Sequence, residues 1–392
     1  MYQAGRHFLQ IPGPTNVPDR VLRAMSAPTI DHRSAEFAEL AKGCLDGMKD
    51  VFQTTSPVII YPASGTGAWE AALVNTLSPG DLVLTVETGQ FGKLWTNVAR
   101  NLGLRVQNIP TDWRHGVNAD VVQARLAADS DHEIAAVMVV HNETSTGVTS
   151  DIPAVRRALD AEKHPALLMV DTISSLASID YRHDEWGVDV SVGGSQKGLM
   201  LPPGLSFNAI GAKAQDASTR ATLPNSFWRW DSMLEFNAKG FFPFTPATNL
   251  LFGLREALQM LLREEGLANV FCRHTRLGRA TREAVNAWGL QIVAQNAQEY
   301  SSTLTGIMMP EGHDESALRA VILKHFNMSL GAGLGQLAGR AFRIGHLGYF
   351  NALMLAGTLS GVEMGLELAG VPHRKGGVEA ALACLTAQAR EL

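Results

Sequence analysis

Three groups of polar residues in this sequence each end or follow a short apolar run of the kind that forms a buried strand. They are Ser64-Gly65-Thr66, Asp171 and Lys197. Ligands of open α/β sheets bind beyond the carboxyl ends of the strands. We therefore expect the three groups at one edge of a sheet, where their side chains can act together.

Each group allows a chemical and a purely structural interpretation. Glycine and hydroxyl residues before a helix can cradle a phosphate at the helix N-terminus, or form an ordinary strand-to-helix turn. Asp171 can pair with a cationic ligand group, or cap a helix. Lys197 can act as an amine nucleophile if burial lowers its pKa, or remain a solvated loop lysine.

Together, the three groups meet the requirements of pyridoxal 5′-phosphate. The cradle would take the phosphate, Asp171 would keep the pyridine nitrogen protonated, and Lys197 would hold the aldehyde as a Schiff base. The sequence therefore predicts an enzyme that uses this cofactor.

Seven short apolar runs supply the strands that would position these groups. Helical stretches separate most of them, which is typical of a sheet buried on both faces. We predict an α/β fold with a doubly wound, mostly parallel seven-stranded sheet and right-handed crossovers. The runs are 57–61, 81–86, 104–110, 133–141, 166–171, 187–194 and 204–210.

The pattern divides the chain into three parts. Residues 1–19 are rich in proline and predict an extended arm, of a kind that often lies across a partner subunit. Residues 20–264 form the predicted large cofactor-binding domain, and residues 265–392 a smaller α+β domain. The smaller domain is expected to contain strands near 302–309 and 341–344, with helices at 267–288, 315–325 and 350–368.

The composition of the 392 residues is that of a globular protein, with 46% apolar residues, 18% charged residues and a net charge of −5. No block of like charges marks a surface for nucleic acid or membrane, so we predict neither partner. No histidine pair has the spacing of a ligand set, so we predict no metal. Three separated cysteines and an N-terminus without a signal peptide favour a reducing, cytoplasmic location.

Longer motifs resemble the class-V, fold-type I aminotransferases over almost the whole chain. The branches that the sequence resembles most are the serine–glyoxylate and alanine–glyoxylate aminotransferases. Residues 184–189 and 245–248 resemble the serine–glyoxylate branch in particular. The other matching segments are 11–16, 64–70, 77–81, 141–147, 170–171, 194–198 and 342–348.

This resemblance implies roles for the residues that would surround the cofactor. Lys197 matches the Schiff-base lysine and Asp171 the partner of the pyridine nitrogen. Phe91 matches the aromatic residue stacked on the ring, and Thr144 a residue near the ring hydroxyl. The positions that match phosphate-binding residues are Ser64, Gly65, Thr66 and Gln196.

Two further matches lie late in the chain. Arg343 matches the arginine that grips the substrate carboxylate, a role that suits the guanidinium fork. Thr245 matches a residue that reaches the phosphate from the neighbouring subunit, which implies a homodimer with shared sites. The relatives usually carry a tyrosine near this threonine, where this chain has Phe241, Phe242 and Phe244, so one phosphate donor is expected to be missing.

The resemblance implies transfer of an amino group from a small L-amino acid, L-serine first, to glyoxylate by a ping-pong mechanism. L-Alanine, L-aspartate and ureidoglycine remain alternative donors. A lyase or a cysteine desulfurase on the same scaffold is a further alternative. A desulfurase needs a mobile cysteine near the cofactor, and neither Cys44, Cys272 nor Cys384 lies in a segment that suits this.

Three other patterns are interpreted as structural. Residues 333–338 fit the dinucleotide pattern G-x-G-x-x-A but lack a following βαβ unit, so we predict a loop over the mouth of the site. Trp228 and Trp230 are expected in the core, and residues 31–33 on the surface.

Overall fold

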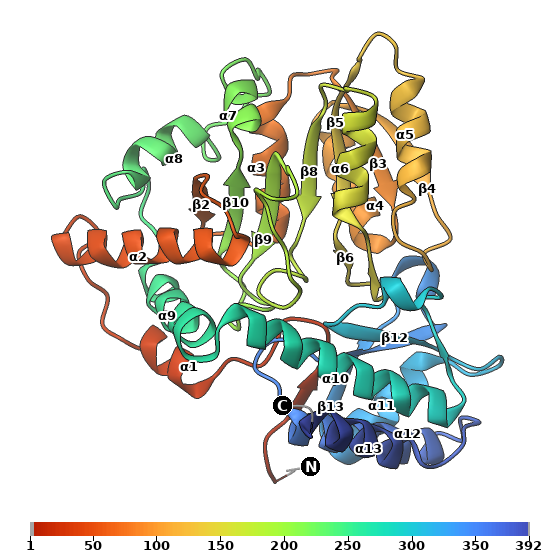
Figure 1. The fold of residues 1–392 in the computed structure, drawn as a ribbon. Helices are drawn as coiled ribbons and strands as arrows, with labels where there is room; N and C mark the ends of the chain where they lie inside the picture. The colour runs from red at the N-terminus through yellow and green to blue at the C-terminus, as the bar shows by residue number, and fades with distance from the viewer. Residues whose placement is uncertain (1–3, 391–392) are drawn as a thin grey trace.

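The computed structural model describes residues 4–390 and places seven strands in one large sheet, in the order β2-β10-β9-β8-β5-β3-β4 (Figure 1). Strand β10 runs antiparallel to β2 and β9, and the other neighbours are parallel. The predicted mostly parallel seven-stranded sheet is therefore confirmed. The strands are β2 (Val58–Tyr61), β3 (Leu82–Glu87), β4 (Arg105–Pro110), β5 (Ile134–Val140), β8 (Leu167–Asp171), β9 (Val190–Gly194) and β10 (Ser206–Ile210).

Helices cover both faces of this sheet, which explains its continuous apolar strands. Strands β8, β9 and β10 are buried at every position. Helices α3 (Gly65–Thr76) and α4 (Gln90–Asn101) lie on one face, and α5 (Ala119–Ala127) and α6 (Ile152–Ala161) on the other (Figure 1). The chain moves across the sheet in one direction through α3 and α4 and returns through α5 and α6, which is the doubly wound arrangement.

Short polar side chains fix where several helices begin. Asn118 accepts hydrogen bonds from the first turn of α5, and Asp151 accepts one from the first turn of α6. Asp314 and Asn351 do the same for two helices of the small domain. Such caps satisfy backbone N–H groups that have no partner within the helix.

The second sheet has five strands in the order β1-β13-β14-β12-β11. The strands and helices expected in the small domain are present, and β11, β13 and α13 are additions that the pattern did not indicate. The strands are β1 (Phe8–Gln10), β11 (Gln291–Ile292), β12 (Leu304–Met308), β13 (Met328–Ala332) and β14 (Ala341–Gly345). The helices are α10 (Leu267–Trp288), α11 (Glu315–Phe326), α12 (Ala352–Leu368) and α13 (Gly377–Ala389).

The N-terminal arm connects the two sheets within this chain. Strand β1 pairs in parallel with β13 of the small sheet. A few residues later, Thr15 N–H donates to Gln196 O at 3.1 Å, and Thr15 Oγ1 donates to Lys197 O at 3.0 Å. The arm therefore fixes the loop after β9 against the small domain.

The remaining helices pack beside the edge strand β2 and at the start of the chain. Helix α2 (Ala35–Phe52) packs against β2 and α9, and α1 (Asp19–Met25) packs against α9. Helix α9 (Thr248–Leu258) continues as a π-helical stretch, Gln259–Glu265. The other elements are α7 (Ala212–Ser218), α8 (Trp230–Asn237), and the hairpin of β6 (Asn142–Glu143) and β7 (Val148–Thr149).

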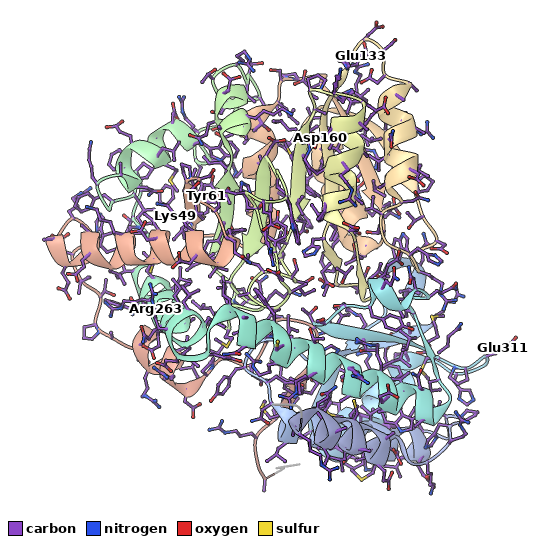
Figure 2. The ribbon with its side chains drawn as sticks, viewed as in Figure 1. Lys49, Tyr61, Glu133, Asp160, Arg263 and Glu311 are labelled. Carbon is purple, nitrogen blue, oxygen red and sulfur yellow. The ribbon has the colours of Figure 1, made fainter. Side chains whose placement is uncertain are left out.

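The surface and the interior differ in the expected way. Figure 2 shows Glu133 and Glu311 at the outline of the molecule; both are exposed, as is Asp160. Tyr61 on β2 is fully buried. Within residues 4–390, no helix combines the length and the apolar character that a membrane span requires.

The loop that carries Lys197 requires a glycine at its next position. A Cβ atom at Gly198 would overlap with the carbonyl oxygen of Leu176 and with Ser178 Oγ. We expect Gly198→Ala to lower the free energy of unfolding by about 1–3 kcal/mol, because backbone atoms must move to relieve the overlap. Urea unfolding followed by circular dichroism measures this change.

The matched control is Gly43→Ala in helix α2. Gly43 is exposed, and a Cβ atom there would meet nothing within 4 Å. This variant should be neutral or more stable by about 0.5–1 kcal/mol, since alanine favours the helix. Equal effects of the two substitutions would contradict the packing argument.

Candidate active site

A cavity of about 230 Å³ lies at the carboxyl edge of the large sheet, on the side that faces the small domain. Strands β2, β8 and β9 end beside it. All the predicted site residues except Thr245 and Arg343 line it, namely Ser64, Gly65, Thr66, Phe91, Thr144, Asp171, Gln196 and Lys197. The expectation that these residues meet at one edge of the sheet is therefore met in the fold.

One end of the cavity is built from the N-terminus of α3. Ser64 occupies the N-cap position, yet its side chain makes no capping hydrogen bond. A Cβ atom at Gly65 would overlap with Ile173, so this position requires glycine. Free backbone N–H groups and an uncommitted hydroxyl make this end suitable for an anion.

Gln196 gives a second sign that this end takes a ligand. Its Oε1 atom is buried and has no hydrogen-bond partner among the described residues. A buried polar atom without a partner costs free energy. A half-turn of the amide exchanges its oxygen with its NH₂ group, so the same side chain can offer two donors to a phosphate.

Asp171 ends β8 and points its carboxylate at the cavity. Its Oδ1 accepts a hydrogen bond from Ile173 N at 2.7 Å, and its Oδ2 accepts one from Trp69 Nε1 at 2.9 Å. Burial raises the pKa of Asp171 to about 7. The carboxylate thus accepts a hydrogen bond from the backbone of the turn that follows it. It is still a buried acid, and a cationic ligand group would stabilise its ionised form.

Lys197 is buried, which excludes the interpretation as a solvated loop lysine. Its side chain is among the buried charged groups, 7% exposed, and its Nζ donates to Pro12 O at 2.5 Å. Burial and, secondarily, the positive charge of Arg343 lower the pKa of Lys197 to about 7. The amine is therefore available as a nucleophile or base near neutral pH.

The arm contributes residues to the site for which the sequence suggested no role. Gly13 and Pro14 line the cavity. A Cβ atom at Gly13 would overlap with the side chain of Lys197, and the φ angle of +112° also favours glycine. The proline–glycine–proline pattern could have indicated a close approach of the backbone, although not what it approaches.

Glu143 is another residue whose role the sequence did not indicate. It is fully buried, and its carboxylate accepts hydrogen bonds from Phe91 N at 3.2 Å, Gly92 N at 3.1 Å and Ser145 Oγ at 2.6 Å. The carboxylate thus holds the first turn of α4, where a negative charge is favoured. This places the ring of Phe91 at the cavity wall.

Arg343 lies on β14 beside the cavity rather than in its wall. Its Nη1 donates to Thr144 O at 2.7 Å, and its Nε donates to Ala332 O at 2.8 Å. Burial lowers its pKa to about 10, so the guanidinium remains charged at neutral pH. The remaining N–H groups of the fork are available to a carboxylate between the domains.

Thr245 and the phenylalanines before it are not among the residues that line this cavity. Thr245 is exposed. Phe242 packs against Phe37 with ring centroids 6.2 Å apart, and Phe244 stacks on Phe227 at 4.4 Å. The segment therefore offers no hydroxyl to the cavity of its own chain.

The residues for which we predicted a structural role lie in a connecting segment, in or beside the core, or in a surface turn. Gly335 of the G-x-G-x-x-A segment packs against Gln90 and Trp113, and the segment joins β13 to β14. Trp230 is in the core, while Trp228 is partly buried and donates to Glu70. Residues 31–33 form a turn at the surface.

Comparison with known proteins places the chain in a family. The family model "Aminotransferase class-V" matches residues 7–335. The chain belongs to the class-V aminotransferase family. It is therefore an aminotransferase, and the family implies pyridoxal 5′-phosphate as its cofactor. The residues of the cavity fit this cofactor, namely the N-terminus of α3, Asp171 and Lys197.

Individual relatives cover nearly the whole chain. A serine–glyoxylate aminotransferase of Methylorubrum extorquens is 49% identical over 96% of this chain and 95% of its own. An L-aspartate–glyoxylate aminotransferase of Paracoccus denitrificans is 46% identical over 95% of this chain and 94% of its own. The crystal structure of pyridoxamine–pyruvate aminotransferase from Mesorhizobium loti has a TM-score of 0.92 and 27% identity, and 98% of each chain is covered.

The buried position of Lys197 predicts an unusual pH dependence for its amine. In the cofactor-free protein, Lys197 can be acylated by a trace amount of an amine-reactive acyl donor. The rate should reach half its maximum near pH 7, because below the pKa of about 7 most of the amine is in the unreactive ammonium form. Mass spectrometry of the labelled peptide at each pH measures this rate.

The control is Arg343→Gln, which removes a neighbouring positive charge. Since that charge lowers the pKa of Lys197, the midpoint should move to higher pH in the variant. A labelling rate of Lys197 that still rises steeply above pH 9 in the parent protein would refute the prediction.

Proposed function

We propose that this enzyme transfers the amino group of a small L-amino acid, with L-serine as the principal donor, to glyoxylate. The products are glycine and, from L-serine, hydroxypyruvate. The observation that carries the proposal is one cavity in which Asp171, Lys197 and the anion-binding end of α3 meet, with Arg343 beside it. The glyoxylate-dependent relatives at 46–49% identity support the choice of acceptor.

Each side chain has a task that follows from its surroundings. Lys197 would hold the cofactor, and its amine would accept the proton from Cα of the donor and return a proton to Cα of the acceptor. Its lowered pKa suits a base near neutral pH. Asp171 would hold the proton on the ring nitrogen, Phe91 would support the ring face, and Arg343 would hold the carboxylate of each substrate in turn.

Bound pyridoxal 5′-phosphate supplies an electron sink for the electron pair that remains when Cα loses its proton. The chain's own contribution is to align the C–H bond and to keep the amine of Lys197 within reach. Donor and acceptor use the same site in succession, so the kinetics should be ping-pong. Ser64, Gly65, Thr66 and Gln196 are proposed to hold the phosphate, and Thr144 to lie near the ring hydroxyl.

L-Aspartate is the alternative donor that a specific observation favours, because the Paracoccus denitrificans relative carries that donor in its name. L-Alanine and ureidoglycine remain weaker alternatives. For a desulfurase, a cysteine would have to reach the cavity. Cys44 is buried against α9, and Cys272 and Cys384 lie in α10 and α13, so none of the three lines it.

A donor panel tests the proposed reaction. L-Serine added without an acceptor should convert the absorption of the bound cofactor completely to that of its amine form, and glyoxylate should restore the original spectrum. L-Aspartate, L-alanine and ureidoglycine are compared by kcat/KM under the same conditions. Release of ammonia or sulfide without a change of cofactor form would identify a lyase or desulfurase instead.

Arg343→Lys tests the carboxylate site within the same assay. The variant keeps a positive charge but loses the bidentate fork. The apparent affinity for both L-serine and glyoxylate should fall about 10-fold to 100-fold, as expected for one lost charge-assisted hydrogen bond. Unchanged saturation by both substrates would exclude this role.

We also propose a homodimer in which Thr245 completes the phosphate site of the other subunit. Support comes from the exposure of Thr245 and from its absence among the residues that line the cavity of its own chain. Mixing Thr245→Ala with Lys197→Ala subunits tests this arrangement. A mixed dimer contains one site with both Lys197 and a donated Thr245, so mixing should restore cofactor binding at limiting concentration and activity.

The control is each variant alone, at the same total concentration. If Thr245 acts within its own chain, no mixed site contains both residues and mixing restores nothing. Analytical ultracentrifugation of the parent protein should give twice the chain mass of 42.2 kDa.

A cytoplasmic location is proposed as well. The three cysteines are free thiols in the structure, which suits a reducing compartment. Cell fractionation with detection of the native protein tests this; recovery in a secreted or envelope fraction would contradict it.

A further inference from the structure

Trp69 stands out among the residues that line the cavity, because its indole is the one side chain that donates a hydrogen bond to Asp171 within residues 4–390. Its Nε1 lies 2.9 Å from Asp171 Oδ2. Trp69 is on the second turn of α3, is only 2% exposed, and also contributes to the cavity wall.

The indole is held rigidly in this position. Its ring stacks on that of Trp95 from α4, with centroids 6.0 Å apart and planes 15° from parallel. Trp95 is 1% exposed, and its own Nε1 has no hydrogen-bond partner among the described residues. The stack therefore contains two buried indoles. The N–H of Trp69 donates to Asp171, and the N–H of Trp95 does not.

The hydrogen bond acts on a carboxylate that burial alone would neutralise. Besides burial, the groups that affect the pKa of Asp171 are the Ile173 N–H and Trp69, which lower it, Lys197, which also lowers it, and Glu143, whose charge raises it. The phenol of Tyr181, packed beneath this region, is itself affected by the charge of Asp171. A donor aimed at Oδ2 favours the ionised form, and each oxygen keeps a lone pair for a ligand.

We propose that Trp69 is a positioning residue that keeps Asp171 ionised and correctly oriented, and thereby sustains the proton on the cofactor's ring nitrogen. The inference rests on the proposed role of Asp171. It adds that the strength of the electron sink is set by an indole donor on α3, a residue for which the resemblance implied no role at the ring.

The test uses Trp69→Phe in the holoenzyme, loaded with cofactor labelled with ¹⁵N in the ring. Phenylalanine keeps an aromatic ring against Trp95 but removes the N–H donor. The ring nitrogen should lose its proton at a pH at least about one unit lower than in the parent enzyme, a tenfold change in proton affinity. The ¹⁵N chemical shift against pH measures this directly.

The matched control is Trp95→Phe, which makes the same stack smaller but removes an N–H that has no hydrogen-bond partner in residues 4–390. It should leave the ¹⁵N titration within about 0.3 pH units of the parent, by comparison with the unit expected for a lost donor. A second variant places 3-benzothienylalanine at position 69. This residue keeps the shape of the indole and exchanges only its N–H for sulfur, so it answers the question if Trp69→Phe folds poorly.

Comparison of kcat with KM distinguishes a positioning role of Trp69 from a role in packing alone. In the Trp69 variants kcat should fall by about tenfold or more with little change in KM, since carboxylate binding at Arg343 is untouched. Equal ¹⁵N titrations in the Trp69 and Trp95 variants and the parent would overturn the inference. An unchanged ¹⁵N signal in Asp171→Asn would instead overturn the proposed role of Asp171 itself.

Discussion

Four ionisable side chains share one poorly solvated region between the two domains, and the remaining structure is organised around keeping them there. Glu143 and Asp171 supply two carboxylates, and Lys197 and Arg343 supply two cations. Isolated charges at this depth would be unfavourable by several kcal/mol each. The mutual influence of the four groups offsets part of this cost, and hydrogen bonds to backbone groups offset more.

The same burial gives the two central groups their chemistry. It lowers the pKa of the Lys197 amine and raises the pKa of the Asp171 acid, so both pKa values lie near neutral pH. An amine in this state can lose its proton without strong base, and an acid in this state gains most from a cationic partner. The site is therefore arranged for a ligand that brings both an aldehyde and a protonated nitrogen.

Close backbone packing maintains this arrangement. The arm passes directly over Lys197, and glycine at position 13 is what permits the approach. Gly65 on α3 allows Ile173 to lie beside the N-terminus of that helix, and Gly198 allows the lysine loop to rest on residues 176–178. Because β1 also joins the small sheet, the arm fixes the position of Lys197 relative to Arg343.

The sequence by itself determined the large sheet, since buried strands must be continuously apolar and the seven runs have that character. It also determined that 64–66, Asp171 and Lys197 would meet, because residues that follow strands in one sheet collect at its edge. Tertiary structure alone decided the rest. Neither the pairing of β1 with β13 nor the contacts of Trp69 and Glu143 could be read from spacing, since their partners lie from about 50 to over 300 residues away in the sequence. Such contacts depend on how whole layers pack, and local pattern carries no information about that packing.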